Sequence, residues 1–244
     1  MPLETLALAS AAALVALLYA AVGHAGASGY ISVMALFGFS RDVIQPTALI
    51  LNIFVACLST AQFYRAGHFR WGLFWPFAVT SVPFAYLGGL WKLPPGVFHL
   101  LLGGTLIFSA IRFIRPTRGP STSHPPGLAA SMLTGAVLGL FAGLTGTGGG
   151  IFLTPVLLLM GWATPKIAAG TSAPFILVNS ISGLAGHFQK SPTVPDVVWT
   201  LLPAVILGGW VGATIGSRFL SETAIKRCLA VVLLIAGGKL VLGL

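Results

Sequence analysis

Long apolar stretches separated by short polar breaks make up nearly all of this chain. In its first half, apolar spans occupy residues 3–22, 43–63, 71–91 and 97–114, with a shorter apolar piece at 30–38. In its second half, the spans are 128–142, 167–185, 197–217 and 224–243, with a shorter piece at 151–161. A run of about 20 apolar residues is long enough for an α-helix to cross a bilayer. The pattern therefore predicts an all-α polytopic membrane protein.

Two glycine-rich segments interrupt this pattern. Residues 23–29 (GHAGASG), here called the first tip, and residues 143–150 (GLTGTGGG), the second tip, each lie between a long span and a short apolar piece. Backbone polar groups cannot remain unpaired in hydrocarbon, so irregular backbone at membrane depth lines a cavity or is buried in protein. We therefore expect both tips to be breaks between helix segments inside the membrane.

The two halves of the chain repeat one another in order. The matched features are AGHF at 66–69 and 185–188, Pro83 and Pro203 each followed by Leu-Gly-Gly, Gly26 with Gly146, and Thr47 with Thr171. Self-similarity at a fixed spacing indicates an internal repeat. The matches predict a first transmembrane repeat at 1–115 and a second at 128–244. Residues 116–127, rich in Pro, Ser, Thr and Gly, form the linker between them.

Composition supports the membrane class. Hydrophobic residues make up 56% of the 244-residue chain and charged residues only 7%, whereas soluble domains carry about 25% charged residues. The net charge of +9 would suggest nucleic acid in a soluble protein. Here the basic residues sit between apolar spans, so they indicate orientation in the bilayer instead. We expect the lipid bilayer as a partner and no nucleic acid.

The basic residues also predict how the halves are oriented. With about five membrane elements in each half, an odd number, the repeats are inverted relative to one another. If the linker is cytoplasmic, the basic residues on that side are Arg65, Arg70, Arg112, Arg115, Arg118, Lys166, Arg218, Lys226 and Arg227. Those on the opposite side are Arg41, Lys92, Lys190 and Lys239. This excess inside obeys the positive-inside rule and predicts both termini on the periplasmic or extracellular face.

The tips are candidate anion-binding sites. The first amides of a helix lack intrahelical partners and carry partial positive charge, and consecutive glycines let a ligand approach them. Two tips meeting in mid-membrane would enclose one small anion, with hydroxyl donors nearby. The candidate residues are His24, Ser28, Gly29, Thr47, Asn52, Thr145, Thr147, Gly148, Gly149, Gly150, Thr171 and Ser172. The alternative is that the glycines only permit close helix packing, as we expect for Gly135, Gly139 and Gly143 and for Gly208, Gly212 and Gly216.

Two further alternatives concern the polar residues. Thr47, Asn52, Thr171 and Ser172 lie early in the third element of each half, where they either wall the same cavity or hold helices together. His24 lies on the first tip, where it either pairs with an anion as an imidazolium and couples transport to protons, or stays neutral and bonded to the tip backbone.

Several function classes lack their residues in this sequence. No nucleophile with a base, paired carboxylates or metal-type cysteine spacing is present, so we expect no enzyme, no cofactor and no metal. Cys57 and Cys228 are interpreted as small core residues. No ATP-binding motif occurs, which favours a secondary transporter. A passive channel on the same repeats stays open as an alternative, and the glycine-lined faces would also allow a homodimer.

The motifs of the second half resemble a known family. They are GTGGGIFLTP at 146–155, AGTS at 169–172, AGHF at 185–188 and LGGWVG at 207–212. With the two tips, they resemble the TauE/SafE sulfite exporter family over essentially the whole chain. The resemblance implies secondary transport of sulfite, organosulfur or other small anions across the bacterial inner membrane. The first half departs from the family pattern, because its tip has fewer glycines and Gln45-Pro-Thr-Ala replaces an Ala-Thr-Ser type. Sulfite, sulfonates, thiosulfate and small carboxylates therefore stay open as substrates.

Overall fold

The computed structural model describes residues 3–91 and 126–221, together with isolated positions and short stretches between 107 and 124 and between 223 and 238. Every regular element in these residues is helical. The helices are α1 (Leu3–Ala20), α2 (Ala27–Leu36), α3 (Arg41–Arg65), α4 (Trp71–Leu90), α6 (Leu128–Thr145), α7 (Gly150–Leu159), α8 (Pro165–Phe188) and α9 (Val197–Thr214), which continues as η1 (Ile215–Phe219). The spans predicted at 97–114 and 224–243 and the linker at 116–127 lie largely outside the described residues.

Six of the described helices are long and apolar enough to cross a membrane, namely α1, α3, α4, α6, α8 and α9 with η1. The all-α membrane class is therefore confirmed. The two short apolar pieces are the ten-residue helices α2 and α7. Helix α8 begins two residues earlier than predicted, because Pro165 takes the first helical position, where its missing N–H is not needed.

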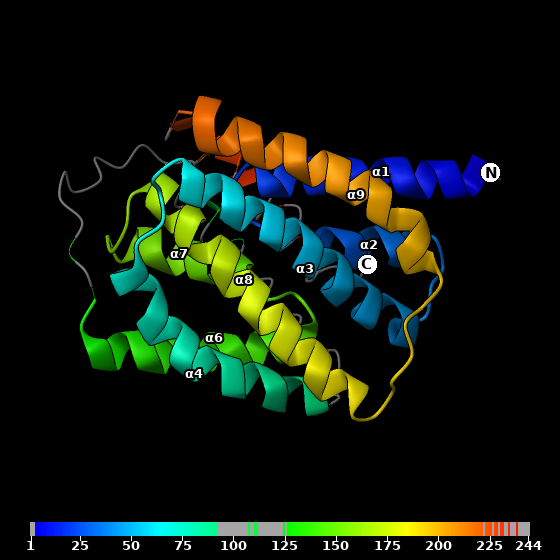
Figure 1. Cartoon of the computed structure of the whole chain (residues 1–244), viewed down its shortest axis with the longest axis horizontal. Helices are drawn as coiled ribbons and strands as arrows, with labels where there is room; N and C mark the ends of the chain where they lie inside the picture. The colour runs from blue at the N-terminus through cyan, green and yellow to red at the C-terminus, as the bar shows by residue number, and fades with distance from the viewer. Residues whose placement is uncertain are drawn as a thin grey trace.

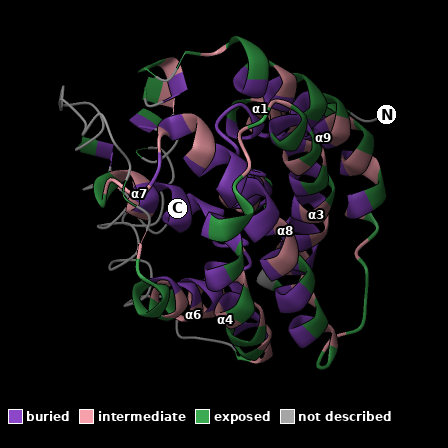
Figure 2. Cartoon of the chain, turned by 60° about the vertical axis from the view of Figure 1, so that its left-hand side comes forward, coloured by how far each residue is buried: buried purple, intermediate pink, exposed green. Residues whose placement is uncertain are grey.

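Helices α3 and α8 form the centre of the molecule. Within their membrane-crossing windows, 56% and 67% of the residues are buried, against 33% for α1 and 39% for α6. Figure 2 shows the buried residues gathered on α3 and α8, with exposed residues on the outer helices. The Asn52 carboxamide of α3 donates to the Ser180 hydroxyl of α8 over 3.2 Å. These two helices cross the molecule side by side in opposite directions (Figure 1).

The helix contacts come in matched sets. Helix α4 packs on α6 and α8, while α9 packs on α1 and α3. Within each half, the short helix contacts the third element, α2 against α3 and α7 against α8. Exchanging α1, α2, α3 and α4 for α6, α7, α8 and α9 converts one set of contacts into the other. The last described long helix of each half, α4 or α9, therefore packs on helices of the other half (Figure 1).

Glycine seams hold the outer helices against one another. A Cβ on Gly135, Gly139 or Gly143 of α6 would collide with the carbonyls of Phe77, Ser81 and Ala85 on α4. Likewise, Gly208 and Gly212 of α9 and Gly216 of η1 lie against the carbonyls of Ala13, Leu17 and Ala21. Without a hydrophobic drive between helices in lipid, close backbone approach supplies the packing attraction. The packing interpretation of these glycines is confirmed.

The two copies of AGHF do not occupy equivalent places. Ala66 follows the last residue of α3, whereas His187 lies in the last turn of α8. Thr47 and Thr171, by contrast, are both the seventh residue of their helices, counting from Arg41 and Pro165. The predicted match between Thr47 and Thr171 therefore agrees with their positions in these helices, whereas the match between the two AGHF copies does not.

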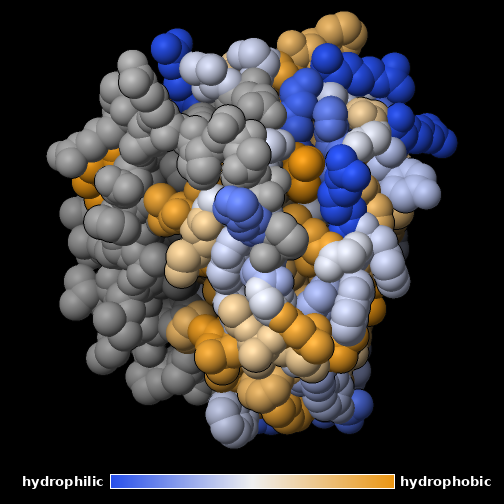
Figure 3. All heavy atoms as spheres, turned by 90° about the vertical axis from the view of Figure 1, so that its left-hand side faces the viewer, coloured by the Kyte–Doolittle hydropathy of each residue, from blue (hydrophilic) through white to orange (hydrophobic). Residues whose placement is uncertain are grey.

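The exterior is apolar over the helices and hydrophilic at their ends. Large exposed apolar side chains include Leu133, Trp199, Leu207 and Trp210. Cys57 is exposed as well, so its interpretation as a core residue is wrong. Figure 3 faces the left-hand end of Figure 1, where hydrophilic side chains gather at one side of the described surface. An apolar girdle with polar ends is the surface expected of a protein in a bilayer.

Candidate anion-binding site

The backbone of both tips takes the left-handed conformation at glycines. In the first tip, φ is 78° at Gly23 and 99° at Gly26; in the second, it is 71° at Gly146 and 77° at Gly149. These two pairs have the same spacing, so Gly23 corresponds to Gly146 and Gly26 to Gly149. The predicted pairing of Gly26 with Gly146 is therefore three residues out of register. The second tip contains several glycines near the start of α7. Sequence alone does not show which of them directly precedes the helix, so it does not fix the pairing.

Local structure explains each glycine of the run 148–150. Gly148 and Gly149 have φ of 71° and 77°, a region that side chains with a Cβ rarely enter. Gly150 has no positive φ, but a Cβ there would collide with the Ile176 side chain. Backbone conformation and packing thus account for the run, so the glycines by themselves do not distinguish a site from a packed turn. Only the polar groups around these glycines can distinguish the two.

One carboxamide joins the two tips. The Asn52 Oδ1 atom accepts the backbone amide of Ala27, the first residue of α2, over 3.0 Å. Its Nδ2 atom donates to the carbonyl of Thr147 in the second tip and to the Ser180 hydroxyl, each over 3.2 Å. Asn52 is fully buried. The tips therefore lie within reach of a single side chain at the centre of the α3–α8 pair.

A hydrogen-bonded chain links the first tip to the second half. The His24 Nε2 atom lies 2.8 Å from the Thr154 hydroxyl of α7, which donates to the Ser172 hydroxyl of α8 over 2.7 Å. Because the only proton of Thr154 goes to Ser172, Nε2 must donate its own proton to Thr154. The Nδ1 atom of His24 is buried and has no partner among the described residues. In a neutral ring, Nδ1 is then the atom free to accept a proton.

Amides of both tips point to no acceptor in the described structure. Those of Gly148, Gly149 and Gly150 make no hydrogen bond, nor do those of Ala25 and Gly26. All five residues are buried. Buried backbone donors are nearly always paired with protein, water or ligand. In general, unpaired amide donors at the start of a helix are groups that can bind an anion.

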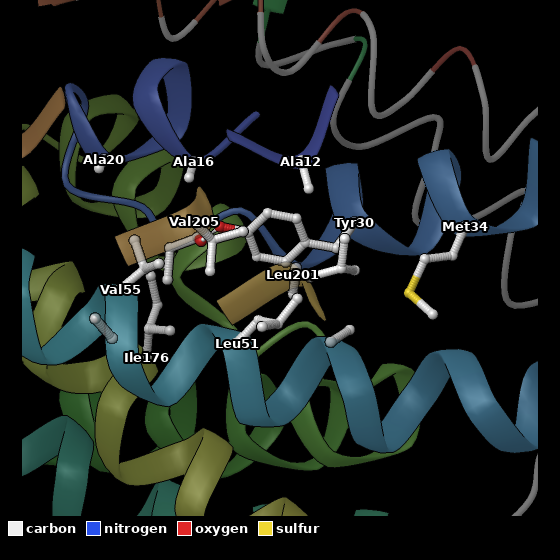
Figure 4. Close-up of a cluster of buried hydrophobic side chains, with 14 of the residues drawn as sticks. Ala12, Ala16, Ala20, Tyr30, Met34, Leu51, Val55, Ile176, Leu201 and Val205 are labelled. Carbon is white, nitrogen blue, oxygen red and sulfur yellow. Dashed lines mark hydrogen bonds between the residues drawn. The ribbon is translucent and has the colours of Figure 1, made fainter. Parts of the chain in front are cut away.

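The first tip is held in place by its own helix. The Tyr30 hydroxyl of α2 donates to the Ala25 carbonyl over 2.7 Å. In Figure 4, the Tyr30 ring lies among Ala12, Ala16, Leu51, Val205 and other apolar side chains from surrounding helices. Burial of this ring fixes the start of α2, and with it the direction of the free tip amides.

The structure brings together only some of the predicted site residues. His24, Asn52, Thr147, Gly148, Gly149, Gly150 and Ser172 belong to the networks and free amides just described. Ser28 instead donates to Tyr19 Oη of α1 over 3.0 Å, and Gly29 packs on Val15. The Thr47 hydroxyl donates to a carbonyl of its own helix. The Thr145 hydroxyl also donates to a carbonyl of its own helix, and it lies 2.8 Å from the Thr147 hydroxyl of the second tip. Thr171 is fully buried, and its hydroxyl has no partner among the described residues.

Sequence reasoning missed Thr154 and Ser180. Both are fully or nearly buried and bonded to predicted site residues. Thr154 belongs to the apolar run of α7 and Ser180 to that of α8, where single hydroxyls ordinarily bond to their own helix. Only the packing of α7 on α8 places Thr154 beside His24. Within the described residues, no group of three His, Cys, Asp or Glu is placed to hold a metal ion.

Comparison with known proteins relates this chain to one family model and to proteins named as membrane transporters. The sequence model described as sulfite exporter TauE/SafE matches residues 8–240. The probable membrane transporter protein y4hK of Sinorhizobium fredii is 44% identical over 98% of this chain and 99% of its own length. The probable membrane transporter protein YunE of Bacillus subtilis is 24% identical over 80% of this chain and 79% of its own. No solved structure matches the chain.

Proposed function

The chain belongs to the sulfite exporter TauE/SafE family, and we propose that it is a secondary transporter of small anions that binds its substrate between the two tips. Transport across a membrane is the activity of the family and agrees with the names of its relatives. The proposal adds the ligand class, sulfite or an organosulfur anion, and the residues that bind it.

The unpaired amides of the two tips are the observation that carries this proposal. They are buried, they belong to helix starts from both halves, and Asn52 holds them close together. None of the charged side chains that the structure describes is buried. The anion would therefore be held by neutral donors, namely the tip amides and the hydroxyl of Ser172, while Asn52 keeps the two tips together.

His24 gives the site a route to proton coupling. Its Nε2 proton is committed to Thr154, so a proton arriving at Nδ1 creates an imidazolium beside the anion. The charged ring then stabilises the bound anion. When the anion leaves, His24 releases the proton from Nδ1 as well, so a proton and a monovalent anion are carried together with no net charge. This accounts for a histidine in the first tip where the second tip has Thr147 in the corresponding position.

The matched helix contacts support two inverted repeats, 1–115 and 128–244. If two halves of opposite orientation share one centre, their tips meet in mid-membrane. The Asn52 contacts, which bring the two tips together, support this arrangement. Positive charge places the Arg65–Arg70 end and the linker 116–127 in the cytoplasm and both termini outside. The location we propose is the bacterial inner membrane.

Flux into proteoliposomes tests the function. We expect uptake of labelled sulfite, stimulated by a pH gradient, and competition by organosulfur anions or small carboxylates that share the site. Absence of flux for every small anion tested would refute the transporter. A channel would instead conduct without saturation and without accumulation against a gradient, so saturation separates the two. Asn52→Leu should abolish saturable uptake, because it removes the bridge between the tips.

A further inference from the structure

Each tip is covered by the third helix of the opposite half. Ala169, the fifth residue of α8, lies against Gly23 of the first tip. Gln45, the fifth residue of α3, lies against Gly146 of the second tip. Gly23 and Gly146 are the corresponding positive-φ glycines of the two tips. The two covering residues therefore occupy matched positions, and their contacts can be compared directly.

The first tip is covered by backbone. The atoms nearest to a Cβ built on Gly23 are the carbonyl oxygen, Cα and Cβ of Ala169, the first of them at 2.5 Å. The chain of hydrogen bonds from His24 through Thr154 to Ser172 ties the same tip to α7 and α8. Uncovering the first tip therefore requires α8 to move as a helix and these hydrogen bonds to break.

The second tip is covered by one side chain. The three atoms nearest to a Cβ built on Gly146 all belong to the Gln45 side chain, with Cγ at 2.9 Å. Its Nε2 atom donates to the Gly143 carbonyl over 3.4 Å, which is long for an N–H···O hydrogen bond. Side-chain rotation at an exposed position takes picoseconds to nanoseconds, whereas collective helix shifts take microseconds to milliseconds. Gln45 can therefore leave the second tip without the movement of a helix.

The hydrogen-bonded chain of the first tip has no equivalent at the second tip. The positions of His24, Thr154 and Ser172 are taken by Thr147, Ile31 and Ala48. Isoleucine and alanine have no side-chain donor or acceptor. In the described structure, Asn52 and Gln45 supply the hydrogen bonds from α3 side chains to the second tip. The bond from Gln45 is the longer of the two.

Exposure differs between the tips in the same sense. Three residues at the second tip are exposed in part, while their counterparts at the first tip are buried: Gln45, Thr145 and Thr147 against Ala169, Val22 and His24. The hydroxyls of Thr145 and Thr147, the two neighbours of Gly146, lie 2.8 Å apart. The polar, partly exposed side of the second tip is thus the side that Gln45 covers.

We propose that Gln45 is the gate through which a small anion reaches the tips from the end of the molecule where α3 begins. In the structure, its side chain lies over Gly146 and closes this end. Rotation of the side chain uncovers Thr147 and the unpaired amides of Gly148 and Gly149, and the freed carboxamide donates to the arriving anion. The orientation proposed from charge places this entrance outside. The identity of the solute rests on the proposed function; the position of the gate does not.

Thiol labelling beneath the gate tests this role. In full-length protein with Cys57→Ala and Cys228→Ala, the single reporter cysteine is Thr147→Cys or, at the corresponding position of the first tip, His24→Cys. Each reporter is combined with unmodified Gln45, with Gln45→Ala and with Gln45→Met, which keeps the length of the side chain. The reagent is a membrane-impermeant anionic thiosulfonate, applied in turn to each side of the membrane.

We expect Gln45→Ala to speed the labelling of Thr147→Cys about tenfold, because thiol reactivity requires access. Entry should be from the side that labels Lys190→Cys, at the exposed end of α8. Gln45→Met should leave the rate within about twofold of the rate with Gln45, since a side chain of similar length still covers the tip. His24→Cys should react at the same slow rate in all three backgrounds, because His24 is buried beyond the gate.

Three outcomes would overturn the proposal. They are an unchanged rate for Thr147→Cys in Gln45→Ala, an equal acceleration of His24→Cys, which indicates general loosening of the fold, and a rate in Gln45→Met as high as in Gln45→Ala. The readout needs no transport activity. Faster labelling of Thr147→Cys in a protein that carries no anion would therefore refute the proposed function and leave the gate in place.

Discussion

A few hydroxyl and carboxamide groups define the chemistry at the scale of single residues. Thr154 is the clearest case, because one hydroxyl accepts from His24 and donates to Ser172. It offers nothing unusual in sequence, being one polar residue in an apolar helix. Its role comes from its two partners, which belong to the first tip and to α8.

Thr154→Val should therefore impair both stability and transport. The substitution keeps the shape but leaves the His24 Nε2–H unpaired, at a cost of about 1–3 kcal/mol. We expect a lower thermal midpoint in detergent and reduced anion uptake. Thr214→Val is the control, since the Thr214 hydroxyl bonds only to the Trp210 carbonyl of its own helix. Equal behaviour of the two variants would show that the chain from His24 to Ser172 has no role.

His24→Ala separates proton coupling from anion binding. If Nδ1 takes up the proton, this variant keeps some uptake down an anion gradient and loses the stimulation by a pH gradient. Uptake is measured with and without the gradient in the same proteoliposomes. Stimulation equal to that of the unmodified chain would exclude His24 as the proton carrier.

At the scale of helices, glycine seams position the elements that carry the site. Gly139 of α6 meets Ser81 of α4 at its backbone. Gly139→Ala should therefore push the helices apart and destabilise the fold by about 1–3 kcal/mol, as overpacking typically does. Gly72→Ala on α4 is the control, because nothing lies within 4 Å of a Cβ there. The midpoint of thermal unfolding is measured for both variants. A midpoint for Gly139→Ala equal to that of the unmodified protein would contradict the close contact between Gly139 and Ser81.

The two short helices differ in how their starts are covered. Asn52 bonds to the first residue of α2, whereas Ile176 packs on the first residue of α7. These residues hold corresponding positions, each the twelfth of its helix counting from Arg41 and Pro165. The two helix starts thus have similar positive-φ glycines, with a polar contact at α2 and an apolar contact at α7. The site is consequently asymmetric even though the helices around it are matched.

At the scale of the whole molecule, the proposed inverted repeat predicts which surfaces face which compartment. Arg70 and Lys190 lie at opposite ends of the helix pair, after α3 and after α8. In a chain without native cysteines, Arg70→Cys should be labelled only from the cytoplasmic side and Lys190→Cys only from outside. Labelling of both from one side would exclude the inverted arrangement, and the reverse pattern would exclude the orientation drawn from charge.

The sequence by itself determined the class of the protein and the places where its helices break. Apolar run length and low charge are enough to predict membrane helices, because hydrocarbon tolerates few alternatives. The left-handed turns also follow locally, since glycine enters that region at little cost. The resemblance to the TauE/SafE family was likewise readable from motifs and is confirmed.

Only the tertiary structure decided which polar residues meet. The register of the tips, the bridge made by Asn52, and the partners of His24 depend on how α3, α7 and α8 pack, and no local pattern encodes that packing. Hydroxyls in a helix bond by default to their own backbone, as Thr47 and Thr145 do. Thr154 and Ser180 instead bond to side chains of other elements, His24 and Asn52. Close helix packing brings these residues, distant in sequence, within hydrogen-bond distance.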